Sequence, residues 1–329
     1  MECRLFKVSV PGSLMLFGEH AVLKGKMAIV MAINARLQIT LIPNNSYKII
    51  IDSDLEVLEI NLNDLSDGLI NKFKDSKLNY VLTSIWNINH LYRINSGFNL
   101  IINNQDLKSN MGFGSSAAIV IGSLMIISKF LNLAIENQKI FNQALTVIHQ
   151  VQDGLGSGAD LAASLYGGII AYQNFKSQKI LTQSLDLAQS LDLVAIYCGY
   201  KVKTAEVIKI IEQQLQQDVY KDLYTNIFNS IDVYSKLAIM AIEKPNLKIL
   251  GKIFNIGHGL MNGLGLVDNN LDQIATNLRA CSTVYGAKIS GAGLGDCVIG
   301  LGKLSKDFIN KINHECFTLQ TSTQGVIWL

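Results

Sequence analysis

The chain has 329 residues, of which 49% are hydrophobic and only 16% are charged. The charged fraction lies below the usual value of about a quarter, so the composition excludes a mostly disordered chain and indicates well-packed domains. The formal net charge is only +2, and no block of Lys and Arg interleaved with aromatic residues occurs, which argues against a nucleic-acid-binding surface. The composition therefore favours a protein that acts on a small molecule.

The first residues and the cysteines bear on the compartment. Residues 1–13 alternate like a strand and contain no continuous apolar run of the length found in signal peptides. The five cysteines are odd in number and far apart, and none has the CxxC or Cys/His spacing of a metal site. We therefore expect reduced cysteines that pack as small apolar side chains, a cytoplasmic protein and no membrane attachment.

Beta structure is predicted to dominate the first hundred residues. Two strands are expected, over residues 4–10 and 14–19, with a break at Pro11 and Gly12. Residues 27–42 read "MAIVMAINARLQITLI", which is typical of two further extended segments.

The stretch "SNMGFGSSAAIVIGSLMIISKF", residues 109–130, has three interpretations: a membrane span, a core helix, or a phosphate-binding loop that leads into a helix. Its apolar run ends at Ile127, well short of the roughly 20 residues that a span needs, so a buried helix is favoured. Ser115 and Ser116 occupy the expected N-cap and first turn, which places free N–H groups beside the glycines and forms a site for an anion. The loop matches neither a Walker A motif nor a dinucleotide fingerprint. A capped core helix without a ligand is the alternative.

The later part of the chain alternates helices with short strands. Helical periodicity is found in residues 141–152, 205–215, 220–242 and 269–285, and strands are expected at residues 191–198 and 296–302. A glycine-rich segment, residues 153–168, follows the first of these helices. This order predicts an α+β architecture in two halves, residues 1–185 and 186–329.

Three glycine-rich stretches stand out together, and they read "PGSLMLFGEHAVLKGK" from Pro11, "NMGFGSSAA" from Asn110 and "KISGAGLGDCVIG" from Lys288. In order and spacing they resemble the three motifs of the GHMP kinase superfamily (galacto-, homoserine, mevalonate and phosphomevalonate kinases). The resemblance extends over nearly the whole chain. It implies a two-domain fold, with a ribosomal S5-like N-terminal domain, a ferredoxin-like C-terminal domain, and ATP and substrate in the cleft between them.

Within that superfamily the first motif is most similar to the PGKxxLFGEHAVxxGxPA of mevalonate kinases, and "YCGYKVKTAEVI" from Tyr197 resembles their YTGxKxxTxEVV segment. The resemblance implies ATP-dependent phosphorylation of the hydroxyl of mevalonate to 5-phosphomevalonate, in isoprenoid precursor biosynthesis. The alternatives are a phosphomevalonate kinase of the same fold and a catalytically weak metabolite sensor. The acceptor would be mevalonate or a related hydroxy acid, and a homodimer is one option for the assembly.

Phosphoryl transfer requires mainly positioning and neutralisation of phosphate charge. By resemblance, Asp160 in "GSGAD" is the catalytic aspartate, and a carboxylate that only complements its helix dipole is the alternative. Ser116 would bind Mg²⁺. The residues expected to bind ATP are Asn110, Gly112, Gly114, Ser115, Ser116, Ala117, Gly291 and Gly293. The residues expected on the substrate side are Glu19, His20, Ser157 and Thr204.

Roles on the substrate side follow from the same resemblance. His20 is expected to contact a carboxylate or hydroxyl of the substrate, and Glu19 to organise the turn of the first motif; satisfied polar groups at a strand end are the alternative. Ser13 stands where mevalonate kinases have a lysine. We expect Lys203, with Lys201 as the other option, to supply the missing positive charge.

Further departures from the family pattern bear on the metal and the substrate. His149 stands where the family places a Mg²⁺-binding glutamate, so two roles stay open for it, metal ligation and a hydrogen bond on the helix face. "GSGAD" in place of PSGxD, and "GDC" from Gly295 in place of GGC, are more similar to phosphomevalonate kinases. A substrate that already carries a phosphate therefore stays open.

Overall fold

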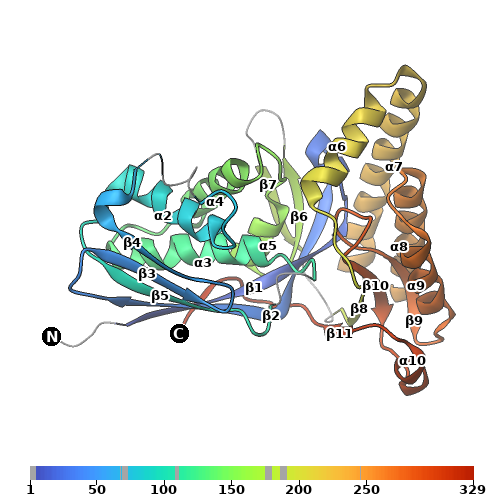
Figure 1. Cartoon of the computed structure of the whole chain (residues 1–329). Helices are drawn as coiled ribbons and strands as arrows, with labels where there is room; N and C mark the ends of the chain where they lie inside the picture. The colour runs from blue at the N-terminus through green and yellow to red at the C-terminus, as the bar shows by residue number, and fades with distance from the viewer. Residues whose placement is uncertain are drawn as a thin grey trace.

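The computed structural model describes residues 5–66, 68, 73–107, 111–174, 180–185, 191–244 and 246–329. These residues form two β-sheets, each with its own helices, and Figure 1 shows the two units next to each other. The mixed content of helices and sheets confirms the predicted α+β class. The expected boundary after residue 185 adjoins residues 186–190, which lie outside the described residues, so the division of the chain at this position stays a prediction.

The first sheet has eight strands and is mainly antiparallel. Its main path, in spatial order, consists of β12 (Ile327–Trp328), β1 (Phe6–Phe17), β2 (Ala28–Pro43), β5 (Phe98–Asn103), β3 (Lys48–Ser53) and β4 (Val57–Asn61). Off this path, β6 (Ile169–Asn174) pairs with β2, and β7 (Ile180–Leu185) pairs with β6. The short helix η1 (Ala21–Lys24) connects β1 to β2, and η2 (Leu62–Asp64) follows β4.

β1 and β2 are each one continuous strand, so the prediction of two segments in each region was wrong. Pro11 lies within β1, and the register against β2 shifts between Pro11 and Ser13, so the Pro-Gly pair causes an irregularity in pairing and not a break. β2 is long enough to have different partners along its length. Its first residues pair with β6 and its last residues pair with β5, while β1 runs along the other side.

Four helices cover one face of the first sheet (Figure 1): α2 (Asn79–Tyr92), α3 (Ser115–Phe130), α4 (Asn137–Val151) and α5 (Ala159–Tyr166). α3 contains the apolar run that raised the question of a membrane span. Nearly all of its residues from Ala117 to Ile127 are buried against the strands and the neighbouring helices, which confirms a core helix. Within the described part of the chain, no helix has both the length and the hydropathy needed to cross a bilayer.

The second sheet has four antiparallel strands in the order β11 (Cys316–Leu319), β8 (Leu193–Tyr197), β10 (Cys297–Gly302) and β9 (Val284–Ile289). Its helices are α6 (Thr204–Leu215), α7 (Asp218–Glu243), α8 (Leu247–Gly263), α9 (Asn269–Ala280) and α10 (Lys306–Lys311). The helix expected over residues 269–285 ends at Ala280, because Val284 and Tyr285 already belong to β9.

The two units are joined by more than the chain connection between them. β12, at the C-terminal end, pairs with β1, and Thr321 forms a bridge with Ile33 of β2, so the last residues belong to the first sheet. Figure 1 shows the two termini at the same end of the molecule. On the other side, Asp232 of α7 accepts a hydrogen bond from the Met27 amide at 2.8 Å. These contacts fix the position of one unit relative to the other.

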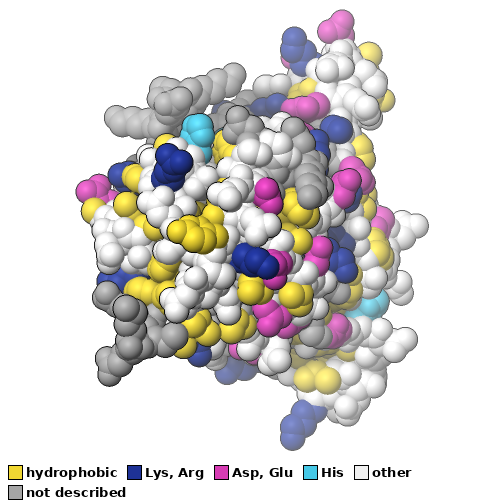
Figure 2. Space-filling model, turned by 60° about the vertical axis from the view of Figure 1, so that its left-hand side comes forward, with side chains coloured by type: hydrophobic (Ala, Val, Ile, Leu, Met, Phe, Trp, Pro, Cys, Tyr) yellow, Lys and Arg dark blue, Asp and Glu magenta, His cyan; other side chains and the backbone are white. Residues whose placement is uncertain are grey.

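The surface carries charges of both signs. Figure 2 shows one face of the molecule, on which basic and acidic side chains are interspersed with apolar and uncharged ones.

Candidate active site

A cavity lies between the two units, and each of the three glycine-rich segments contributes to its wall. The predicted site residues found in the wall are Glu19, His20, Gly112, Gly114, Ser115, Ser116, Ala117, Ser157, Asp160, Thr204 and Gly291. Gly293 and Lys203 do not line it, and Asn110 lies outside the described residues. The fold thus brings together segments as far apart in the chain as Glu19 and Asp296.

The start of α3 forms one side of the cavity. Gly114, and not Ser115, is the N-cap: its φ is 67°, and no side chain caps the helix, so the expected serine cap was wrong. The backbone can take this left-handed conformation because Gly114 has no Cβ; an added Cβ would lie 1.8 Å from Ser13 Oγ. Helix geometry leaves the amides of the first turn without intrahelical acceptors, and Ser115, Ser116 and Ala117 all line the cavity. These amides can bind an anion.

Asp160 also lines the cavity, and it lies in the first turn of α5. The Ser13 hydroxyl donates a hydrogen bond to Asp160 Oδ1 at 2.7 Å, and Ser13 itself is fully buried. Burial raises the pKa of the Asp160 carboxyl, while the Ser13 hydrogen bond and the positive charge of Lys201 oppose this shift. Ser13 is therefore a direct partner of the predicted catalytic aspartate, a role that sequence reasoning missed because it considered only the lost lysine.

Of the two lysines expected to supply a positive charge, Lys201 is the one in the cavity wall. Its Nζ lies 3.5 Å from Oδ1 of Asp296, which also lines the cavity. Lys203 is exposed at the N-cap of α6 and lies outside the wall. Strand alternation would put residues 201 and 203 on the same side, so the difference arises from the turn of the backbone into α6, whose N-cap is Lys203.

Asp296 is a second buried carboxylate of the site, and sequence reasoning assigned it no role. Only 8% of the residue is exposed, and burial raises the pKa of its carboxyl against the opposing charge of Lys201. The signal in the sequence was the departure from glycine in "GDC".

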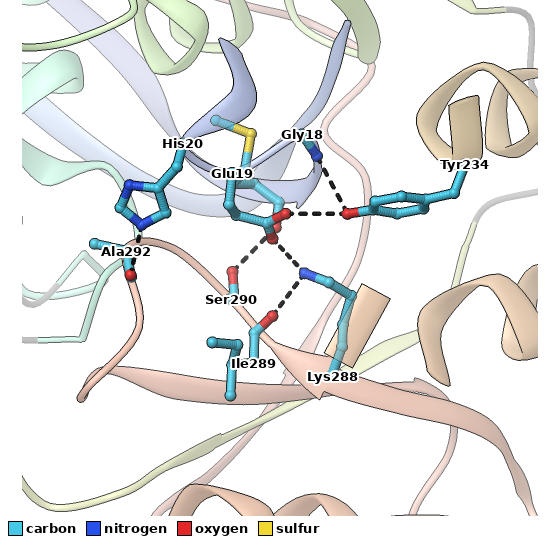
Figure 3. A network of polar contacts seen from close by, with 9 residues as sticks. Gly18, Glu19, His20, Tyr234, Lys288, Ile289, Ser290 and Ala292 are labelled. Atoms are coloured by element: carbon cyan, nitrogen blue, oxygen red, sulfur yellow. Dashed lines mark hydrogen bonds and ion pairs between the residues drawn. The ribbon is translucent and has the colours of Figure 1, made fainter. Parts of the chain in front are cut away.

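Glu19 belongs to a buried network that joins the first motif to the second unit (Figure 3). Its carboxylate forms an ion pair with Lys288 of β9 and accepts a hydrogen bond from the Tyr234 hydroxyl of α7 at 3.4 Å. The Lys288 ammonium also donates to the Ile289 carbonyl at 2.6 Å. Burial raises the pKa of Glu19, and the charge of Lys288 opposes it. Glu19 thus fixes the turn of the first motif against β9.

His20 follows in the same turn and has a φ of 56°. Its Nε2 lies 2.7 Å from the carbonyl oxygen of Ala292 in the third glycine-rich segment, as Figure 3 shows. Burial lowers the pKa of His20, so the ring is neutral at neutral pH. Because a carbonyl only accepts, Nε2 carries the proton, and Nδ1 is left as a hydrogen-bond acceptor.

Other predicted residues divide into those that face the cavity and those that support its wall. Thr204 begins α6 and lines the cavity. Ser157 lines it too, and its Oγ accepts a hydrogen bond from the Ala159 amide at 3.2 Å.

Two further residues of the motifs lie outside the cavity wall. His149 Nε2 lies 3.0 Å from the Gly156 carbonyl, a hydrogen bond that joins the end of α4 to the α4–α5 connection. Gly293 packs away from the cavity, where an added Cβ would lie 2.6 Å from the Leu266 carbonyl oxygen.

Comparisons with known proteins identify the family of the chain. Residues 79–168 match the model of the GHMP kinase N-terminal domain, and residues 238–315 match that of the GHMP kinase C-terminal domain. A mevalonate kinase of Methanocaldococcus jannaschii is 30% identical over 315 residues, which cover 94% of this chain and 96% of that protein. The chain belongs to the GHMP kinases. A mevalonate kinase of Saccharolobus solfataricus is 26% identical to this GHMP kinase, over 98% of the chain and 99% of the relative.

Solved structures give the same result for the fold. The crystal structure of the Methanococcus jannaschii mevalonate kinase matches with a TM-score of 0.81 and 26% identity, over 97% of this chain and 98% of that one. A Streptococcus pneumoniae phosphomevalonate kinase matches with a TM-score of 0.78 at 18% identity, which shows the fold alone. The two-domain GHMP kinase fold is thereby confirmed.

The cavity of this GHMP kinase also contains groups that fit a metal-bound nucleotide. The Ser116 hydroxyl and the carboxylates of Asp160 and Asp296 are oxygen donors of the kind that Mg²⁺ prefers. Among the described residues, no group of three or more His, Cys, Asp and Glu side chains is arranged to hold a metal ion. Mg²⁺ needs only one or two protein carboxylates when phosphate oxygens supply further ligands, so these donors suffice.

Proposed function

We propose that the chain catalyses transfer of the terminal phosphoryl group of ATP to the hydroxyl of mevalonate. The observation that carries the proposal is the arrangement of the cavity. Asp160, whose carboxylate accepts a hydrogen bond from Ser13, lines the same cavity as Lys201 and the first turn of α3. This places a base, an anion-binding helix terminus and a positive charge around one point, as phosphoryl transfer requires. The kinase relatives support ATP as the phosphoryl donor.

Each group has a distinct task in this proposal. The amides of the α3 loop and the glycines of residues 112–114 bind the phosphates, and Lys201 neutralises charge on the group in transfer. Since the Ser13 hydroxyl donates to Oδ1 of Asp160, the other carboxylate oxygen is the one we assign to the substrate hydroxyl. Ser116 would hold Mg²⁺, which supplies charge neutralisation on the phosphates when it is bound. Asp160 orients the hydroxyl and takes its proton, a step that can come late in a loose transition state.

The charges in the cavity favour mevalonate over phosphomevalonate as the acceptor. Among the described residues of the wall, Lys201 is the only Lys or Arg, and it already faces Asp296. A phosphorylated acceptor would add about two negative charges to a site that must also bind the nucleotide. The similarity of "GSGAD" and "GDC" to phosphomevalonate kinases adds no cation to the wall.

His20 supports the same acceptor through its hydrogen-bonding state. With its proton directed at the Ala292 carbonyl, the neutral ring offers only an acceptor to the cavity. We therefore assign His20 to a substrate hydroxyl and not to the carboxylate. Thr204, at the free end of α6, is the residue we assign to the carboxylate, because the α6 N-terminus favours a negative charge.

An assay of ADP release tests the proposal, with mevalonate, phosphomevalonate, galactose and homoserine as acceptors in parallel. We expect kcat/KM to be highest with mevalonate and Mg-ATP. Preferred turnover of phosphomevalonate would instead assign the chain to the second activity. Nucleotide binding without turnover of any of these acceptors would favour the metabolite sensor.

A further inference from the structure

Asp296 is held in the cavity wall by its backbone, at a position that favours glycine. Its φ is 63°, in the left-handed region, and it follows Gly295 in the turn between β9 and β10. An aspartate tolerates this region better than most residues but still less well than glycine. Its amide donates to the Tyr200 carbonyl and its carbonyl accepts from the Cys198 amide, both at 3.0 Å. The turn is thus fixed to the segment that carries Lys201.

The side chain of Asp296 reaches the phosphate-binding loop on the other unit. A Cβ added to Gly112 would lie 2.9 Å from Asp296 Cγ and 3.1 Å from Oδ2, so the carboxylate packs directly on this loop. Oδ1 is buried and accepts no hydrogen bond, and its charged neighbour is the Lys201 ammonium at 3.5 Å. A buried carboxylate oxygen without a hydrogen-bond donor is costly unless a cation occupies the space beside it.

We propose that Asp296 makes nucleotide binding depend on the metal, by contributing a carboxylate to Mg²⁺ and repelling the phosphates of metal-free nucleotide. The inference rests on the proposed function, because it needs the nucleotide phosphates in the loop beside Gly112. Metal-free ATP brings more negative charge to this wall than Mg-ATP, and Lys201 alone cannot neutralise both the phosphates and Asp296. His149 stands where the family has a Mg²⁺-binding glutamate, and its ring is hydrogen-bonded to the Gly156 carbonyl.

Calorimetric titration with ADP, in Mg²⁺ and in EDTA, tests the inference on the parent and on Asp296→Asn. The ratio of the two dissociation constants measures metal dependence separately from activity. In Asp296→Asn we expect metal-free ADP to bind more tightly and Mg-ADP more weakly, so that the ratio falls at least about tenfold. Asp296→Gly, which suits the backbone at this φ, should give the same result and guards against misfolding of the first variant. A titration with Mn²⁺ in the presence of ADP, monitored by electron paramagnetic resonance, should show weaker metal binding in both variants.

Asp192→Asn is the matched control. Asp192 also pairs with a lysine, Lys303 at 3.3 Å, but lies outside the cavity wall. The ratio of the ADP dissociation constants in Mg²⁺ and in EDTA should be the same for Asp192→Asn as for the parent. Unchanged ratios in both Asp296 variants, or shifts of both dissociation constants in the same direction, would overturn the inference and leave the proposed function standing. A parent that binds ADP in neither buffer would overturn both.

Discussion

Replacement of Asp160 by Asn separates catalysis from stability at this site. The Asn side chain has nearly the same shape, and its amide oxygen can still accept the hydrogen bond that Ser13 donates at 2.7 Å. The negative charge and the basic oxygen are lost. General-base contributions are typically about 10² to 10⁴ in rate, so kcat should fall at least about 10²-fold, equivalent to about 2.7 kcal/mol in the barrier. Nucleotide affinity should change little, because the amides of the α3 loop bind the phosphates.

The same substitution should lower kcat without lowering the stability of the fold. Burial raises the pKa of Asp160 above its usual value of 3.8, so the protein binds this proton more tightly when folded than when unfolded. Such a group stabilises the fold below its unfolded pKa, and that contribution is lost as the pH rises through the folded pKa. Above the folded pKa the ionised, buried carboxylate therefore costs stability. Asp160→Asn should have a Tm equal to or above that of the parent at neutral pH, and the difference should shrink in acid.

Three measurements on the purified variant decide the matter: kcat from ADP release, nucleotide affinity from calorimetry, and Tm as a function of pH. Asp192→Asn, outside the cavity, should behave like the parent in the first two. A variant of Asp160 with near-normal kcat and a lowered Tm would refute the reasoning. It would show that the carboxylate only complements the dipole of α5.

Further predictions concern the cations, the α3 terminus and the buried network. Lys201→Met should reduce kcat at least about tenfold and shift the acid limb of the pH profile upward, because its charge lowers the pKa of the catalytic carboxyl. Lys203→Met should match the parent, and equal losses in the two variants would contradict this assignment. Ser116→Ala should raise KM for Mg-ATP with little change in Tm, since no side-chain cap is lost; a lowered Tm with unchanged kinetics would argue for a structural role. Lys288→Met should reduce the free energy of unfolding, measured with urea, by about 3–5 kcal/mol because Glu19 is left buried without its cation. Adding Glu19→Gln should restore much of the loss, and a failure to do so would contradict the pairing argument.

The features that the sequence determined are local. The apolar run that ends at Ile127 is too short for a membrane span and long enough for a helix, and α3 is a buried helix of this kind. Asp160 follows a glycine-rich run at a predicted helix start, and it lies in the first turn of α5. The order of the three glycine-rich segments sufficed to identify the superfamily. Periodicity and turn residues depend on residues close in the chain, and the order of motifs follows directly from the sequence, so none of these features requires knowledge of the fold.

Tertiary structure alone decided which side chains meet. Glu19 contacts Lys288 and Tyr234, which are 269 and 215 residues away, and no local pattern connects them. The choice of Lys201 over Lys203 depends on the path of the backbone between the second sheet and the start of α6, which no local pattern predicts. The contact of Asp296 with the loop at Gly112 exists only because the two units pack against each other. Such contacts depend on strand register and on the closure of one unit on the other, which are properties of the whole fold.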